Sequence, residues 1–75
     1  MQLSDVLVHV SEKINADEKN YLVNQLRGLN GVIAPRFSEN KEHLLLVSYN
    51  SDAVSALSLL NTVKQSGLHA QLVGL

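Results

Sequence analysis

Residues 6–32 read VLVHVSEKINADEKNYLVNQLRGLNGV, and this stretch decides how the chain folds. Val6, Val8 and Val10 alternate with Leu7 and His9, which is the two-residue period of a β-strand with different residues on its two faces. We therefore predict a first strand whose three valines point towards a core and whose His9 side chain points the other way.

A helix is expected directly after this strand. Asn15 can cap it, and Glu18 can reach back to the Asn15 amide in a variant of the capping box. Leucines then recur on one side, at spacings of four and three: Leu22, Leu26 and Leu29. Asn30-Gly31 supplies residues that tolerate a left-handed exit. The pattern predicts a helix from Ala16 to Leu29.

The next segments read as a hairpin. Val32–Glu39 is a strand that contains Pro35, which cannot donate a ladder hydrogen bond and so belongs at a sheet edge or a bulge. Pro35 and Arg36 also protect such an edge against the addition of another strand. A polar turn over residues 38–42 leads into a second apolar strand, His43–Tyr49, and the short connection implies antiparallel pairing.

A second helix and a last strand complete the chain. Ser51 is the expected cap, and Gly67 the expected stop. The predicted buried face of this helix comprises Ala53, Ala56, Leu57, Leu60 and Val63. Leu68–Val73 then alternates as a strand, with Leu68, Ala70 and Leu72 inward and His69 outward.

The order strand-helix-strand-strand-helix-strand predicts an α+β fold of the ferredoxin-like type. In that fold a four-stranded antiparallel sheet carries both helices on one face and leaves the other face open. With 75 residues and no linker or low-complexity tract, we expect one domain over residues 1–75.

Composition limits the possible functions. The formal net charge is −1, and there is no basic excess of the kind that nucleic acid or an anionic membrane demands. No apolar run is long enough to insert into a bilayer, so we expect a soluble, cytoplasmic protein. No glycine-rich phosphate loop and no spaced nucleophile, base and orienter are present, so we expect no enzyme activity.

Three segments resemble the heavy-metal-associated domain family. Leu29-Asn30-Gly31-Val32 is similar to its Leu-Pro-Gly-Val segment, Val47-Ser48-Tyr49-Asn50 to its Val-x-Tyr-Asp, and residues 67–73 to its Gly-Tyr-x-Ala-x-Leu-Val ending. The resemblance implies that the two metal-binding cysteines of the family fall on Asn15 and Glu18. The chain contains no cysteine, so the thiolate site for soft ions such as Cu(I) is degenerate here.

Carboxylate and histidine side chains are the other candidate metal ligands in the sequence. Carboxylates at Glu12, Asp17 and Glu18 suit a hard cation, but acidic residues at a helix amino terminus are ordinary dipole partners. His9 and His69 share the outward parity on neighbouring strands, whereas two imidazoles without a third ligand do not make a zinc site. His43, near the hairpin turn, is interpreted as unrelated. We therefore expect no bound cofactor, and a metal ion only as an alternative.

The open sheet face carries the main functional hypothesis. With Leu45, Val47 and Tyr49 inward, exposed aliphatic groups gather on the other side in numbers that monomers seldom leave bare. The expected interaction face comprises Leu7, His9, Leu44, Leu46, His69 and Val73. It would serve a protein partner or a homodimer. We predict a noncatalytic interaction or regulatory module; the alternatives are a metal-binding domain that uses His or carboxylate ligands, and a dimeric module that senses a small molecule.

Overall fold

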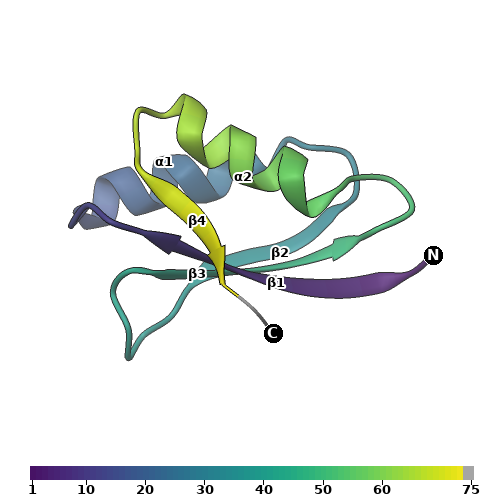
Figure 1. Cartoon of the computed structure of the whole chain (residues 1–75), viewed down its shortest axis with the longest axis horizontal. Helices are drawn as coiled ribbons and strands as arrows, with labels where there is room; N and C mark the ends of the chain where they lie inside the picture. Colours follow the sequence, from purple (N-terminus) through teal and green to yellow (C-terminus); the bar gives the residue numbers. More distant parts are fainter. Residues whose placement is uncertain (74–75) are drawn as a thin grey trace.

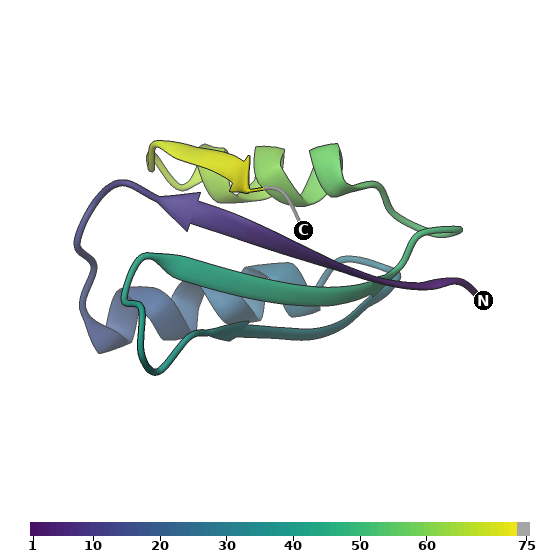
Figure 2. The same ribbon diagram turned by 60° about the horizontal axis from the view of Figure 1, so that its bottom comes forward.

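The computed structural model describes residues 1–73, which form a sheet layer covered on one side by two helices (Figure 1). The elements are β1 (Leu3–Val10), α1 (Ala16–Arg27), β2 (Val32–Phe37), β3 (Leu44–Asn50), α2 (Ala56–Gln65) and β4 (Ala70–Val73). The strands lie in the order β2-β3-β1-β4, and each pairs antiparallel with its neighbours. Figure 2 brings the uncovered side of the sheet forward. The predicted ferredoxin-like α+β fold is confirmed.

The core lies between the sheet and the helices and is aliphatic. Val8 and Val10 of β1 are buried, as are Leu45 and Val47 of β3, because alternate residues of both strands face the helices. The helices pack buried side chains against this face of the sheet: Leu22 and Leu26 from α1, and Leu59, Leu60 and Val63 from α2. The alternation predicted for β1 is therefore confirmed, and the same alternation directs His9 away from the core.

Helix α1 begins as predicted. The Glu18 amide donates to Asn15 Oδ1 at 2.8 Å, and the Asn15 amide donates to Glu18 Oε1 at 3.1 Å, which completes a capping box. The helix ends at Arg27, two residues before the predicted Leu29, with Gly28 as the C-cap. The chain reverses at Gly31, whose φ of 100° lies in the left-handed region predicted for this position.

Strand β2 lies at the sheet edge, where Pro35 requires it to be. Pro35 pairs with Val47, and the missing N–H of the proline faces no further strand. The register shifts between Val32 and Ala34, an irregularity of the kind that the proline also predicts. The antiparallel hairpin between β2 and β3 is confirmed.

The prediction for the start of α2 was wrong. Ser51 lies in a turn in which the Asn50 side chain accepts from the Asp52 amide at 3.1 Å, and Ser55 caps the helix by accepting from the Ser58 amide at 3.1 Å. The residues of α2 that face the core also differ from the prediction at one position. Leu57 is 60% exposed and Leu59 is fully buried, whereas the prediction had placed Leu57 inside.

Strand β4 is shorter than predicted and begins at Ala70, because residues 68 and 69 form an irregular segment after the turn at residues 66–67. Gly67 has a φ of 86°, which confirms it as the helix stop. Leu68 and Ala70 pack against the core as expected. Leu72 is 40% exposed, contrary to its predicted inward position, because β4 is an edge strand with a neighbour on one side only.

Candidate functional site: the first loop and the open sheet face

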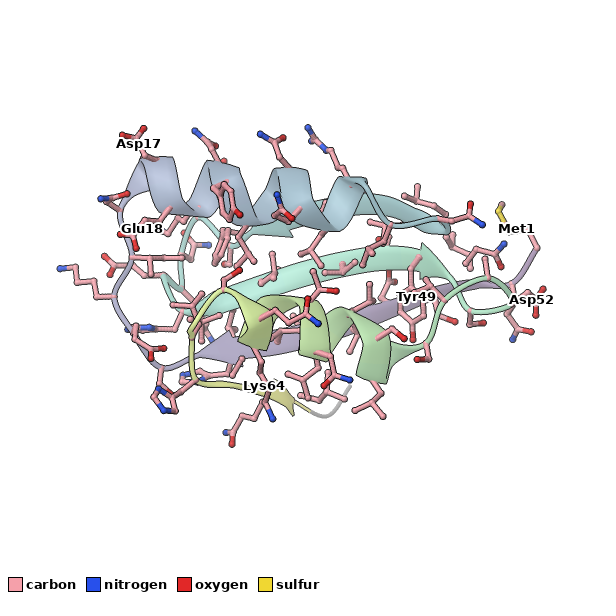
Figure 3. All side chains as sticks on the ribbon, turned by 90° about the horizontal axis from the view of Figure 1, so that it is seen from above. Met1, Asp17, Glu18, Tyr49, Asp52 and Lys64 are labelled. Atoms are coloured by element: carbon pink, nitrogen blue, oxygen red, sulfur yellow. The ribbon has the colours of Figure 1, made fainter. Side chains whose placement is uncertain are left out.

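The first loop holds the two positions where the family resemblance implies metal-binding cysteines. Asn15 and Glu18 occupy them, and both side chains are hydrogen-bonded to backbone amides in the capping box of α1. Figure 3 shows Asp17 and Glu18 together at the amino-terminal end of this helix. Carboxylates there stabilise the helix dipole, so the polar groups of the loop act in local structure.

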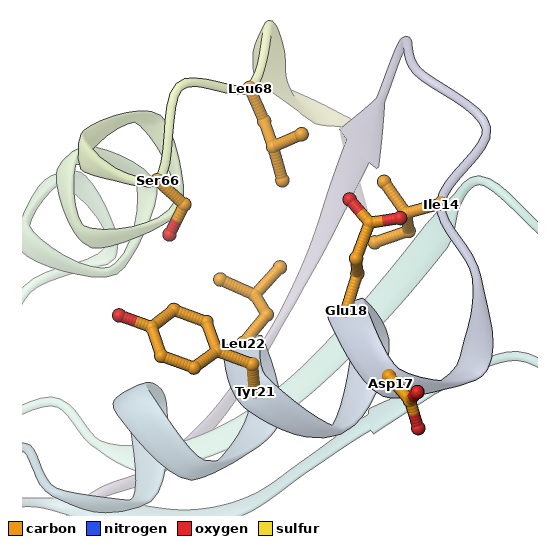
Figure 4. Close-up of a pocket in the computed structure, with 7 residues that line it drawn as sticks. All are labelled: Ile14, Asp17, Glu18, Tyr21, Leu22, Ser66 and Leu68. Atoms are coloured by element: carbon orange, nitrogen blue, oxygen red, sulfur yellow. The ribbon is translucent and has the colours of Figure 1, made fainter.

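A cavity of about 260 Å³ opens beside this loop, between α1 and the turn after α2 (Figure 4). Ile14, Leu22 and Leu68 supply its apolar walls, and the Tyr21 ring and the Glu18 carboxylate border it. This cavity could not be predicted from the sequence, because its walls come from segments that only the fold brings together.

Hydrogen bonds join Glu12, just after β1, to His69, just before β4. The His69 amide donates to both carboxylate oxygens of Glu12, at 2.9 and 3.1 Å, and His69 Nδ1 lies 2.6 Å from Glu12 Oε2. The side-chain hydrogen bond from His69, followed by that from its amide, lowers the pKa of Glu12 below its ordinary value. The side chain of His69 is 87% exposed.

His9 has another histidine, His43, as its neighbour. The rings of His9 and His43 stack with centroids 5.6 Å apart and planes inclined by 30°. His43 Nδ1 lies 2.8 Å from the Val10 carbonyl oxygen, so this nitrogen carries the proton that it donates. His9 Nδ1 is buried and has no hydrogen-bond partner. The interpretation of His43 as unrelated to the other histidines is therefore wrong. The pairing of β1 with the start of β3 brings it beside His9.

Metal ligands do not gather in the part of the chain that the structure describes. Within residues 1–73, no three His, Asp or Glu side chains lie together in an arrangement that could hold a metal ion. Glu12 is hydrogen-bonded to His69, while Glu18 is hydrogen-bonded to the Asn15 amide. The candidate metal ligands Glu12 and Glu18 thus take part in separate hydrogen-bonded groups.

The open sheet face brings the predicted aliphatic residues together. Leu7 of β1 pairs with Leu46 of β3 on one side and with Val73 of β4 on the other. His9 pairs with Leu44 in the next row. All five side chains are half-buried, not exposed as predicted, because neighbours in adjacent strands cover one another. We name Leu7, His9, Leu44, Leu46 and Val73 the open-face patch.

Polar groups lie beside the open-face patch in two places. Beyond the Leu7 row, Ser48 Oγ donates to Asp5 Oδ1 at 2.6 Å across β3 and β1. Arg36 of β2, the register partner of Leu46, is exposed at the sheet edge. Polar groups therefore border the open-face patch along the strands and at its β2 side.

Within residues 1–73, neither helix combines the length and apolar character needed to cross a bilayer. No protein-family model matches the chain. No curated protein matches it in sequence either.

Solved structures match the fold closely at low sequence identity. The N-terminal domain of a potential copper-translocating P-type ATPase from Bacillus subtilis, in the Cu(I)-loaded state, has a TM-score of 0.86 and 20% identity, over 97% of this chain and 90% of that one. The yeast copper transporter domain CCC2A has a TM-score of 0.82 and 23% identity, over 93% and 94% of the two chains. Oxidized MerP from Ralstonia metallidurans CH34 has a TM-score of 0.84 and 11% identity, over 97% and 100%. The chain thus has the ferredoxin-like fold of heavy-metal-associated domains, and it has this fold without any cysteine.

Proposed function

We propose that this domain is a noncatalytic interaction or regulatory module that docks a protein partner on its open-face patch. The observation that carries the proposal is the unbroken row of aliphatic side chains across three strands, Val73, Leu7 and Leu46, with Leu44 in the adjoining row. An apolar centre bordered by polar groups is the usual arrangement of a protein interface, and here Asp5, Ser48 and Arg36 provide the border.

The first loop supports a role other than thiolate chemistry. We propose that its metal clamp is degenerate, and that Asn15 and Glu18 now serve the helix cap in which both take part. Several proteins of the same fold are described as copper-binding. Soft metals select sulfur ligands, and an amide with a single carboxylate does not replace two thiolates. The predicted cytoplasmic location stays a prediction from the sequence.

Two substitutions test the patch directly. Leu44→Asp and Leu46→Asp each place a charge in its apolar centre without touching the core, so both variants should stay folded and should lose partner binding. Leu57→Asp makes the same chemical change at a side chain that is 60% exposed on α2, and it should bind as the wild type does. Circular dichroism and thermal unfolding establish that all three variants fold.

The readout compares the variants in one binding assay. Sedimentation equilibrium first measures whether the chain associates with itself, and labelled protein is then used to quantify the affinity for any partner that the wild type captures. Loss of association in the two patch variants but not in Leu57→Asp supports the proposal. Full association by both patch variants would exclude this face as the interface.

A further inference from the structure

A second recessed surface lies between α1 and β2. It is a groove of about 320 Å³, large enough to receive one or two side chains of a bound segment. Val23 of α1 and Pro35 and Phe37 of β2 provide its apolar residues. Lys19, Arg27 and Arg36 also line the groove, the first two on α1 and the third on β2.

Positive charge is concentrated here in a molecule that has no overall positive charge. The chain has six Lys and Arg residues and a net charge of −1, and three of those six residues line this one groove. None of the groove-lining residues in the described chain is acidic. The field at this site is therefore local, and it attracts an anionic group that reaches the groove rather than a long polyanion.

The geometry of the cations suits carboxylates next to apolar groups. Lys19 Nζ lies 5.3 Å from the centroid of the Phe37 ring, so its ammonium lies over an aromatic face at the groove. Arg27 and Arg36 are both exposed, and a guanidinium binds a carboxylate through two parallel hydrogen bonds. Pro35 has no N–H to offer, so recognition by an added strand is impeded at this position and side chains must provide the contacts.

Arg36 is both a lining residue of the groove and the register partner of Leu46, so it is the residue that the groove and the border of the open-face patch share.

We propose that the α1–β2 groove binds an acidic segment of a partner protein, in which Asp or Glu side chains pair with Arg27, Arg36 and Lys19 and an apolar neighbour contacts Val23 and Phe37. This assignment rests on the proposed function in that it takes the partner to be a protein, but the groove can be tested without the open-face patch.

The test uses peptides and the intact protein labelled with nitrogen-15. The probe is acetyl-Asp-Leu-Glu-Leu-Asp-amide, and the controls are acetyl-Asn-Leu-Gln-Leu-Asn-amide, which has the same shape without charge, and inorganic phosphate. We expect the acidic peptide to shift the amide resonances of Lys19, Val23 and Phe37 at saturation. Raising the ionic strength from about 0.01 M to about 0.15 M should weaken binding, since the Debye length falls from ~30 to ~8 Å.

Variants assign the contacts. Arg27→Gln and Arg36→Gln should each weaken the acidic peptide by roughly two- to fivefold, which is the range of exposed ion pairs. Lys64→Gln makes the same charge change outside the groove and should leave the affinity unchanged. Leu44→Asp should also keep peptide binding, so that failure of the open-face patch and failure of the groove give different results.

Three outcomes would overturn the proposal. Binding of the uncharged peptide as tightly as the acidic one would make the site merely apolar. Competition by phosphate at equal concentration would make it a simple anion site. A loss of binding in Lys64→Gln as large as that in Arg27→Gln would make the attraction a property of net charge.

Discussion

At the scale of single residues, Asn15 shows how the first loop supports the start of α1. Its side chain accepts the Glu18 amide at 2.8 Å and satisfies one of the backbone donors that a helix start leaves free. Asn15→Ala should lower the free energy of unfolding by about 1 kcal/mol, as measured by urea denaturation. Asn61→Ala, at an exposed position inside α2, is the control and should cost nothing or slightly stabilise the protein. An equal loss in both variants would contradict the cap.

Glu12 gives a prediction for pH. Because hydrogen bonds from His69 lower its pKa in the folded chain, the folded state favours the charged carboxylate more than the unfolded state does. The resulting stability is fully present above the ordinary glutamate pKa of about 4.3 and is lost as the pH falls through the lower folded value. Glu12→Gln should therefore be less stable than the wild type near neutral pH, and the difference should shrink as the pH falls below about 4.

Urea titrations of both proteins at several pH values measure this difference. Glu39→Gln removes a carboxylate from the exposed hairpin turn and should show no comparable trend. A difference between Glu12→Gln and the wild type that stays constant down to strongly acidic pH would rule out a contribution from the Glu12 carboxylate.

The sequence predicts residues well where the signal is local. The capping box of Asn15 and Glu18 depends on four consecutive residues, and the structure confirms it. His9 and His43 are 34 positions apart, and only the register of β1 with β3 shows that their rings stack. Parity along a strand assigned His9 to the open face but could not say which residue lies beside it.

At the scale of elements, the two positive-φ glycines differ in what surrounds them. A Cβ added at Gly31 would lie 2.8 Å from the Cβ of Ala53 and 3.0 Å from Val54 Cγ1, whereas one added at Gly67 would meet nothing within 4 Å. Gly67→Ala should therefore cost only the left-handed backbone, about 1–2 kcal/mol, and Gly31→Ala should cost clearly more. Chemical denaturation of the two variants compares them, and equal losses would contradict a steric contribution at Gly31.

The elements also show where a local pattern misleads. Ser51 and Ser55 are both acceptable helix caps by residue type, and the first was predicted. The Asn50 side chain and backbone carbonyl hold residues 52–54 in a turn, which leaves Ser55 as the first position from which a helix can run. Leu59, rather than Leu57, lies in the core because it shares a helix face with Ala56, Leu60 and Val63, at the spacings i, i+3, i+4 and i+7.

At the scale of the whole molecule, a small core makes stability sensitive to each large side chain. Leu26 is fully buried between α1 and the sheet, and Leu26→Ala should lower the free energy of unfolding by about 2–5 kcal/mol. This is a large part of the 5–15 kcal/mol that is typical of whole domains, so the variant should unfold at far lower urea concentration. Leu57→Ala, at a side chain that is 60% exposed, should stay within about 0.5 kcal/mol of the wild type.

The fold as a whole was predictable because the local pattern of each segment indicates a helix or a strand, and few arrangements fit that order of elements. The candidate surfaces were harder to predict. The open-face patch follows from strand parity, whereas the cavity beside the first loop and the α1–β2 groove depend on side chains from separate segments. The half-buried state of the patch also depends on cross-strand neighbours, which parity does not identify.

The position of β1 has a consequence for how the domain is made. This strand comes first in the chain, yet it lies inside the sheet, where Leu3 pairs with Asn50 and Leu7 pairs with Val73. Both of its partner strands, β3 and β4, are synthesised later. The pairs that β1 makes with them can therefore form only after those segments have been made. Long-range pairing of this kind slows the search for the native state, and we expect refolding on the order of milliseconds rather than the microseconds of simple helical bundles. Stopped-flow refolding would measure it, and a single cooperative phase would show that the sheet closes in one event.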